Sequence, residues 1–166
     1  MTVRILVAGV GNIFLCDDGF GPETARRLAE RSPAAGRHSD DVRVVDYGIR
    51  GMHLAYDLLD GWDSLVLVDA VPGDGDPGTI DVLAVSAEDL GGGEVDAHGM
   101  DPVATLGHLD ALGGKLPPTY VVGCRPAETT DGIGLSPAVE ASVDEAVVVI
   151  ESLVSDLLSK SVRVLS

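Results

Sequence analysis

Short apolar runs of strand length alternate along this chain with stretches of helical periodicity, and this alternation restricts its possible folds more than any other feature. It is typical of β-α-β units, in which helices cover both faces of a parallel sheet. The run at residues 65–68 is apolar at every position, which suits a strand buried on both faces. We therefore predict the α/β class, as a three-layer sandwich with a twisted, mostly parallel sheet of about five strands and helices on both faces. Strands are expected at residues 4–9, 42–47, 65–68, 79–85 and 119–124, and helices at residues 19–31, 51–59, 101–112 and from 136 onward.

The length and charge of the chain narrow its class further. Its 166 residues contain no linker, so we predict a single domain over residues 1–166. No apolar run is long enough to cross a bilayer and the N-terminus does not resemble a signal peptide, so we expect a cytoplasmic protein. The formal net charge of −16 would repel nucleic acid and anionic membranes, which excludes both as expected partners. Most of that charge is also explained by a solvated surface that favours solubility.

The two cysteines do not form a CxxC pair. Cys124 ends an apolar run and is predicted to be a small core residue. Cys16 directly precedes Asp17 and Asp18, whose negative charges would raise the pKa of its thiol. We therefore predict a structural role for Cys16 and not a nucleophilic one.

Three residues that can carry chemistry lie at strand ends or just before helices. Asp18 follows the first strand, Asp69 follows the apolar run at residues 65–68, and His98 precedes a predicted helix. Each also has an ordinary interpretation, namely a helix N-cap, a turn former and a solvated loop histidine. In parallel sheets, however, ligands bind beyond the carboxyl ends of the strands. Two carboxylates and one imidazole at that edge would suit Zn²⁺ or Ni²⁺ and leave an open coordination position.

A second interpretation starts from the glycine pair Gly9 and Gly11. These could open a dinucleotide-binding loop, with Asp46 as the acid that binds the ribose. Phe14 stands where that motif needs its third glycine, so the motif is incomplete. A nucleotide-binding Rossmann-like module is kept as the alternative. The HExxH and GxSxG signatures of other hydrolases are absent, as is a P-loop.

The motifs resemble those of a known family, the hydrogenase maturation proteases. The resemblance is carried by residues 5–12 (ILVAGVGN), 17–21 (DDGFG), 45–48 (VDYG), 67–71 (LVDAV), His98 and 132–137 (GIGLSP). Members of this family are endopeptidases that remove a C-terminal tail from the large subunit of [NiFe]-hydrogenases after nickel insertion. The resemblance therefore implies a peptidase whose partner is a [NiFe]-hydrogenase large-subunit precursor.

The resemblance also implies which residues form the site. The family's metal ligands match Asp18, Asp69 and His98, which are then both the catalytic and the metal-binding residues, with Asp17 as a further catalytic candidate. The nickel is implied to be borne by the substrate, and Zn²⁺ or Cd²⁺ could substitute for it in crystals. His108 is a fallback for the imidazole ligand. A non-catalytic, metal-binding maturation chaperone is a third interpretation.

One segment departs from the family's usual pattern. Where the family often has Gly-Gly-Thr after the second strand, this chain has Tyr47-Gly48-Ile49. We expect this loop to lie near the substrate, so the departure bears on the choice of partner.

Overall fold

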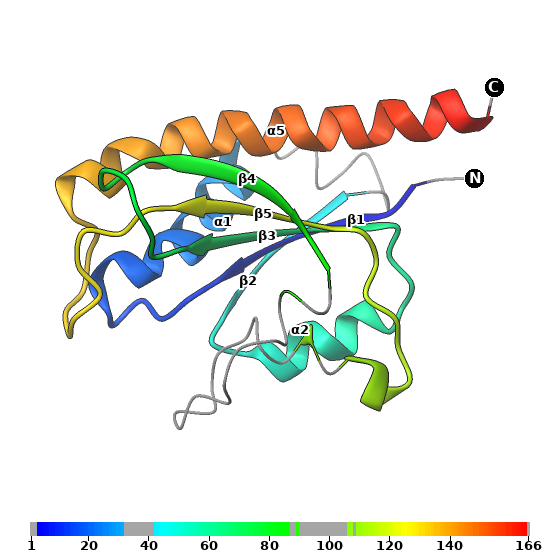
Figure 1. Cartoon of the computed structure of the whole chain (residues 1–166), viewed down its shortest axis with the longest axis horizontal. Coiled ribbons are helices and arrows are strands. Elements are labelled where there is room, and N and C mark those ends of the chain that lie inside the picture. Colours follow the sequence, from blue (N-terminus) through cyan, green and yellow to red (C-terminus); the bar gives the residue numbers. More distant parts are fainter. Residues whose placement is uncertain (1–2, 32–41, 87–88, 90–105, 108, 166) are drawn as a thin grey trace.

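The computed structural model describes residues 3–31, 42–86, 89, 106–107 and 109–165 (Figure 1). Its centre is a five-stranded sheet in the order β2-β1-β3-β5-β4. Strand β1 (Ile5–Val10) pairs in parallel with β2 (Val42–Gly48) and with β3 (Ser64–Ala70). Strand β3 pairs in parallel with β5 (Thr119–Cys124), and β4 (Ile80–Val85) is antiparallel to β5 at the edge. The predicted mostly parallel five-stranded sheet is therefore confirmed.

Helices cover both faces of this sheet, as predicted. On one face lie α1 (Phe20–Arg31) and the long C-terminal helix α5 (Pro137–Leu165), and on the other lies α2 (Gly51–Leu58) (Figure 1). A 3-10 turn, η1 (Cys16–Gly19), leads into α1, and a second, η2 (Leu109–Leu112), precedes β5. Of the predicted helix at residues 101–112, residues 101–105 and 108 lie outside the described residues, and residues 109–112 form η2.

The central strands alternate their side chains between two apolar cores. In β1, Ile5 and Val7 pack toward α1 and α5, whereas Leu6 and Ala8 pack toward α2. This follows from the period of two in a strand, and burial on both faces explains why such a strand is apolar at every position. Helix α5 contributes a stripe at helical spacing to the first core: Val139, Val143, Ala146, Val147, Ile150 and Leu157.

Two predicted boundaries are corrected. Strand β3 continues through Asp69 to Ala70, so Asp69 lies within the strand and does not follow it. The cause is pairing, because Asp69 is in register with Gly123 of β5 and the ladder does not stop at the last apolar residue. Helix α1 begins at Phe20, because the preceding residues form the tighter 3-10 turn.

The start of α1 lies directly on the ends of β1 and β3. A Cβ atom added to Gly21 would lie 2.2 Å from the carbonyl oxygens of both Val10 and Val68, and one added to Gly9 would lie 2.4 Å from the Gly21 carbonyl oxygen. Only glycine permits this approach, since the clashing atoms are backbone and cannot turn away. The close packing places the segment before α1, including Asp18, at the carboxyl edge of the sheet. Within the described residues, no helix is both long and apolar enough to span a membrane.

Candidate functional site at the carboxyl edge of the sheet

The order of the strands places a topological switch point between β1 and β3. The chain leaves β1 for β2 on one side and later returns to β3 on the other, so the connections diverge at this point. In open α/β sheets, ligands bind at such a switch point. Asp18 lies in η1 immediately beyond β1, Asp69 lies near the end of β3, and η1 contacts β3. Two of the three predicted site residues therefore lie on neighbouring elements at this edge. Both residues are of intermediate exposure.

The third predicted ligand, His98, lies outside the described residues, and so does the fallback His108. In the part of the chain that is described, no three His, Cys, Asp or Glu side chains gather closely enough to hold a metal ion. His53, which the sequence prediction did not consider, is the histidine that this part contains. Its Nε2 lies 3.8 Å from the Asp57 carboxylate and its ring packs edge-on to Tyr47, on the α2 side of the sheet. The Asp18, Asp69 and His98 site thus stays a prediction.

The Asp18 side chain bonds to the backbone of its own loop, the glycine-containing loop between β1 and α1. Its Oδ2 accepts a hydrogen bond of 2.7 Å from the Asn12 amide. Gly11 has a φ of +142°, and a Cβ there would lie 1.9 Å from the Asp18 carbonyl oxygen, so glycine is required at this position. The hydrogen bond holds the Asp18 carboxylate in one orientation at the edge of the sheet, as outer contacts do for metal-ligating carboxylates.

The same loop argues against the nucleotide-binding alternative. A phosphate cradle needs backbone amides that face the ligand. Here the Gly11 amide donates to the Gly48 carbonyl (3.0 Å), the Asn12 amide to the Asp18 carboxylate and the Phe14 amide to Asn12 Oδ1 (2.9 Å). Three amides of the loop are therefore used within the protein, one of them by a carboxylate that would repel a phosphate.

Phe14, which stands where the dinucleotide motif needs its third glycine, lies at the surface. Its side chain is 61% exposed and does not obstruct α1. Gly21 allows the close approach instead, and it lies in the DGFG part of the motif that carried the family resemblance.

Asp17 is buried and holds two distant loops together. Its Oδ1 accepts from the Ser136 amide (2.7 Å), and its Oδ2 accepts from the Ala127 amide (2.8 Å), the Glu128 amide (3.0 Å) and the Ser136 hydroxyl (2.8 Å). Burial by itself raises the pKa of this carboxyl, but the hydrogen bonds from Ser136, Glu128 and Ala127 outweigh burial, and the pKa is lowered. A fully buried carboxylate with four donors suits a structural role better than the catalytic role considered from the sequence.

The raised pKa predicted for Cys16 is confirmed, and of the two adjacent carboxylates it is Asp17 that contributes to it. Burial raises the pKa of Cys16 first, and the charges of Glu128, Asp17 and Asp131 raise it further. Two of these three acids come from the loop after β5, which the sequence alone did not place beside Cys16. Cys124 is 1% exposed and lies in the core, where burial raises its pKa to about 11.

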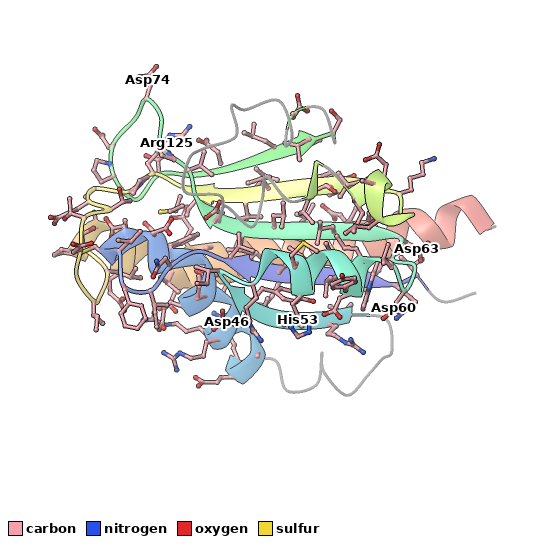
Figure 2. The ribbon with its side chains drawn as sticks, turned by 90° about the horizontal axis from the view of Figure 1, so that it is seen from below. Asp46, His53, Asp60, Asp63, Asp74 and Arg125 are labelled. Carbon is pink, nitrogen blue, oxygen red and sulfur yellow. The ribbon has the colours of Figure 1, made fainter. Side chains whose placement is uncertain are left out.

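Arg125, which the sequence prediction missed, orders the loop that follows Asp69. Its guanidinium donates to the carbonyls of Val71 (3.0 Å) and Asp74 (2.9 Å) and forms an ion pair of 2.9 Å with Asp81. Figure 2 shows Asp74 and Arg125 together at one end of the sheet, with Asp60 and Asp63 at the other. A single arginine directly after an apolar strand, in a chain with an acidic turn at residues 72–78, is the signal that could have found it.

Several solved structures with this fold are hydrogenase maturation endopeptidases. The hydrogenase maturating endopeptidase HybD from E. coli superposes with a TM-score of 0.73 at 28% identity, with 93% of each chain covered. The [NiFe] hydrogenase maturation protease HybD from Thermococcus kodakarensis superposes with a TM-score of 0.69 at 26% identity, covering 92% of this chain and 99% of that one. The fold thus matches a class of small α/β endopeptidases.

Sequence comparison gives the same answer. The family model described as hydrogenase maturation protease matches residues 23–153. The hydrogenase 2 maturation protease of Escherichia coli is 32% identical over 146 residues, which are 87% of this chain and 86% of the relative. The coenzyme F420 hydrogenase subunit delta of Methanothermobacter thermautotrophicus is 32% identical over 148 residues, covering 87% of this chain and 90% of the relative. The chain belongs to the hydrogenase maturation protease family, and it is a peptidase.

Proposed function

We propose that this peptidase removes the C-terminal extension of a [NiFe]-hydrogenase large-subunit precursor after nickel has been inserted. Asp18, Asp69 and His98 recognise the nickel that the precursor carries. The observation that supports this most directly is the position of Asp18 and Asp69 on neighbouring elements at the switch point of the sheet. The names of the relatives, which are hydrogenase maturation proteases and endopeptidases, support the same substrate class. We include a cytoplasmic location in this proposal.

The chemistry of the proposed ligands fits a metal borne by the substrate. Carboxylate oxygens and an imidazole nitrogen suit borderline divalent ions such as Ni²⁺. Asp18 and Asp69 are of intermediate exposure at an edge, so they offer ligands without enclosing the ion. Binding then depends on what the precursor supplies, and this makes the presence of nickel a condition for recognition.

The solvent exposure of Asp17 and Asp18 indicates which of the two carboxylates acts on the attacking water. Asp17 is fully buried and its pKa is lowered, so it is a poor base for an attacking water. Asp18 is partly exposed and held in place by the Asn12 amide, so we propose that it positions or deprotonates the water. The nickel in the substrate can polarise the scissile carbonyl. In this assignment Asp18 acts on the water, and Asp17 holds in place the loop on which Asp18 lies.

The deciding measurement is the mass of the precursor before and after incubation with this protein. We expect the nickel-loaded precursor to become shorter at a single position, and the nickel-free precursor to keep its mass. Asp69→Asn, checked by thermal melting, serves as the matched control and should leave both precursors intact. Complex formation without any loss of mass would instead support the non-catalytic chaperone.

A second assay tests the dependence on metal in the substrate. Casein and an unfolded reporter protein carry no nickel and should release no peptides above the buffer rate. Peptide release from either of them would contradict a site that relies on nickel in the substrate.

A further inference from the structure

Three large apolar side chains are exposed on two loops beside the site. Ile13 is 49% exposed, Phe14 61% and Ile133 78%. We call these three residues the apolar loop patch. Single exposed apolar side chains are ordinary, but a cluster that includes an aromatic ring beside a candidate site is typical of an interaction surface.

Backbone hydrogen bonds join the two loops that form the patch. The Gly132 amide donates to the Phe14 carbonyl (2.9 Å), and the Cys16 amide donates to the Gly132 carbonyl (2.9 Å). Leu15 and Gly132 form a parallel bridge. Ile133 therefore lies next to the segment that carries Ile13 and Phe14, and both loops lie at the same end of the sheet (Figure 1).

Hydrogen bonds to the buried Asp17 carboxylate hold the apolar loop patch in place. The buried carboxylate of Asp17 accepts hydrogen bonds from the Ala127, Glu128 and Ser136 amides, so the loop after β5 is fixed to the loop after β1. A preformed apolar surface loses little conformational freedom when a partner binds, which increases the affinity obtained from its area.

The patch adjoins Asp18. The Cα atom of Ile13 would lie 3.3 Å from a Cβ added to Gly19, the residue after Asp18. Asn12, the residue before Ile13, donates its amide to the Asp18 carboxylate. A polypeptide that covers the patch would therefore lie alongside Asp18.

The surroundings of the patch are acidic. Glu128 and Asp131 are exposed on the same loop as Ile133, and both are close enough to Cys16 for their charges to act on its thiol. The whole chain carries a formal charge of −16. A partner segment with apolar side chains flanked by lysine or arginine complements such a surface, because opposite charges favour encounter and register.

We propose that the apolar loop patch is the docking surface for an apolar segment, flanked by basic residues, of the hydrogenase large-subunit precursor next to its processing site. This inference rests on the proposed function. Phe14 is the central anchor, and Ile13 and Ile133 complete the apolar area around it. Docking here brings the scissile region to Asp18, whereas nickel recognition checks that the precursor is loaded.

The test compares the double variant Phe14→Ser/Ile133→Ser with three controls. Val148→Ser removes another exposed apolar side chain (51%) from α5, away from the site. Phe14→Leu keeps an apolar side chain at the anchor. Asp131→Asn removes one of the surrounding charges. Thermal melts check that all variants fold, which we expect because the substituted side chains are exposed.

The readouts are the KM and kcat for cleavage of the nickel-loaded precursor, and its Kd measured by surface plasmon resonance. The double variant should raise both KM and Kd by at least about tenfold with kcat within about twofold of wild type. Val148→Ser and Phe14→Leu should stay near wild type. Asp131→Asn should slow association at low salt more than at high salt.

The outcomes separate this inference from the proposed function. If wild type cleaves the precursor and the double variant has an unchanged KM and Kd, the docking surface is wrong while the function stands. If wild type binds the precursor without cleaving it and the double variant loses binding, the docking surface stands and the proteolytic role fails. A loss in kcat alone, or no binding by wild type, overturns the docking inference.

Discussion

The buried carboxylate of Asp17 accepts hydrogen bonds from both the amide (2.7 Å) and the hydroxyl (2.8 Å) of Ser136, a residue 119 positions further along the chain. Ser136 lies immediately before α5, and Asp17 lies immediately before Asp18. The contact therefore fixes the start of the C-terminal helix to the loop that carries a proposed ligand. Loss of this contact should therefore affect both the stability of the fold and the position of Asp18.

Asp17→Asn should destabilise the protein by about 2–4 kcal/mol. Both carboxylate oxygens accept hydrogen bonds from N–H donors, so either orientation of an Asn side chain turns its NH₂ group toward one of these donors. Urea unfolding measures the change. Ser136→Ala is the matched control, because it removes the hydroxyl bond and keeps the amide bond, and it should cost only about 1 kcal/mol. Equal stability of Asp17→Asn and wild type would contradict the structural role.

The same variant should change the dependence of stability on pH. The pKa of Asp17 is lowered in the folded protein from the ordinary value of 3.8, so the unfolded state binds the proton more readily. The stabilisation is complete above that ordinary value and is lost as the pH falls through the lower folded pKa. The difference in unfolding free energy between wild type and Asp17→Asn should therefore shrink below pH 4, roughly. A difference that stays constant down to the acid limit would show that the charge of Asp17 is not involved.

Loss of a proposed ligand should weaken metal binding. Removal of an outer contact at a metal site costs about 10–100-fold in affinity, so Asp69→Asn and Asp18→Asn should weaken Ni²⁺ or Zn²⁺ binding at least as much. Asn at position 18 can still accept the Asn12 amide, so the glycine loop should stay closed. His98→Ala should have the same effect on the metal. Calorimetric titration of wild type and the three variants measures these affinities, with thermal melts as the folding control.

The outcome distinguishes ligands from ordinary loop residues. A turn former or an N-cap tolerates Asn in place of Asp, so those roles predict equal metal affinity. Equal affinity in all four proteins would rule out the proposed site. If metal affinity falls in the two Asp variants but not in His98→Ala, the two carboxylates are ligands and the third ligand is a residue other than His98.

Cys16→Ser should leave processing largely intact. The raised pKa of Cys16, caused by burial and by the charges of Glu128, Asp17 and Asp131, keeps the group a neutral thiol at neutral pH. The rate of precursor shortening at pH 7 measures this, with the melting temperature as a check of folding. A complete loss of cleavage in folded Cys16→Ser would make a thiol mechanism the leading explanation.

Thr24→Val should stabilise the protein by about 1 kcal/mol. The Thr24 hydroxyl is buried in α1 and has no hydrogen-bond partner among the described residues, so it carries a desolvation cost without compensation. Valine has nearly the same shape and a similar helix propensity. Differential scanning calorimetry should show a rise in Tm of about 2–4 °C. Thr24→Ser keeps the hydroxyl and loses a methyl group, so it should lower the Tm, and a rise in both variants would contradict this explanation.

Much of the fold could be predicted because its determinants are local. The apolar run at residues 65–68 and the stripe from Val139 to Leu157 place these segments in a buried strand and a core helix, since side-chain period and hydrophobic burial are properties of a short window. The same holds for Cys124 in the core and for one cause of the raised pKa of Cys16, since Asp17 is adjacent in the sequence whereas Glu128 and Asp131 are not. The identity of the family likewise followed from motifs that are continuous in the chain.

The tertiary structure decided what depends on residues far apart in the sequence. Asp17 is a candidate base when considered alone, and its four donors from residues 127, 128 and 136 make it a structural carboxylate. Gly21 is required because α1 lies on the ends of two strands, and Phe14 lies beside Ile133 because the Gly132 amide donates to the Phe14 carbonyl. No local pattern encodes these contacts, because each depends on two segments that meet only when the sheet and its covering helices have assembled.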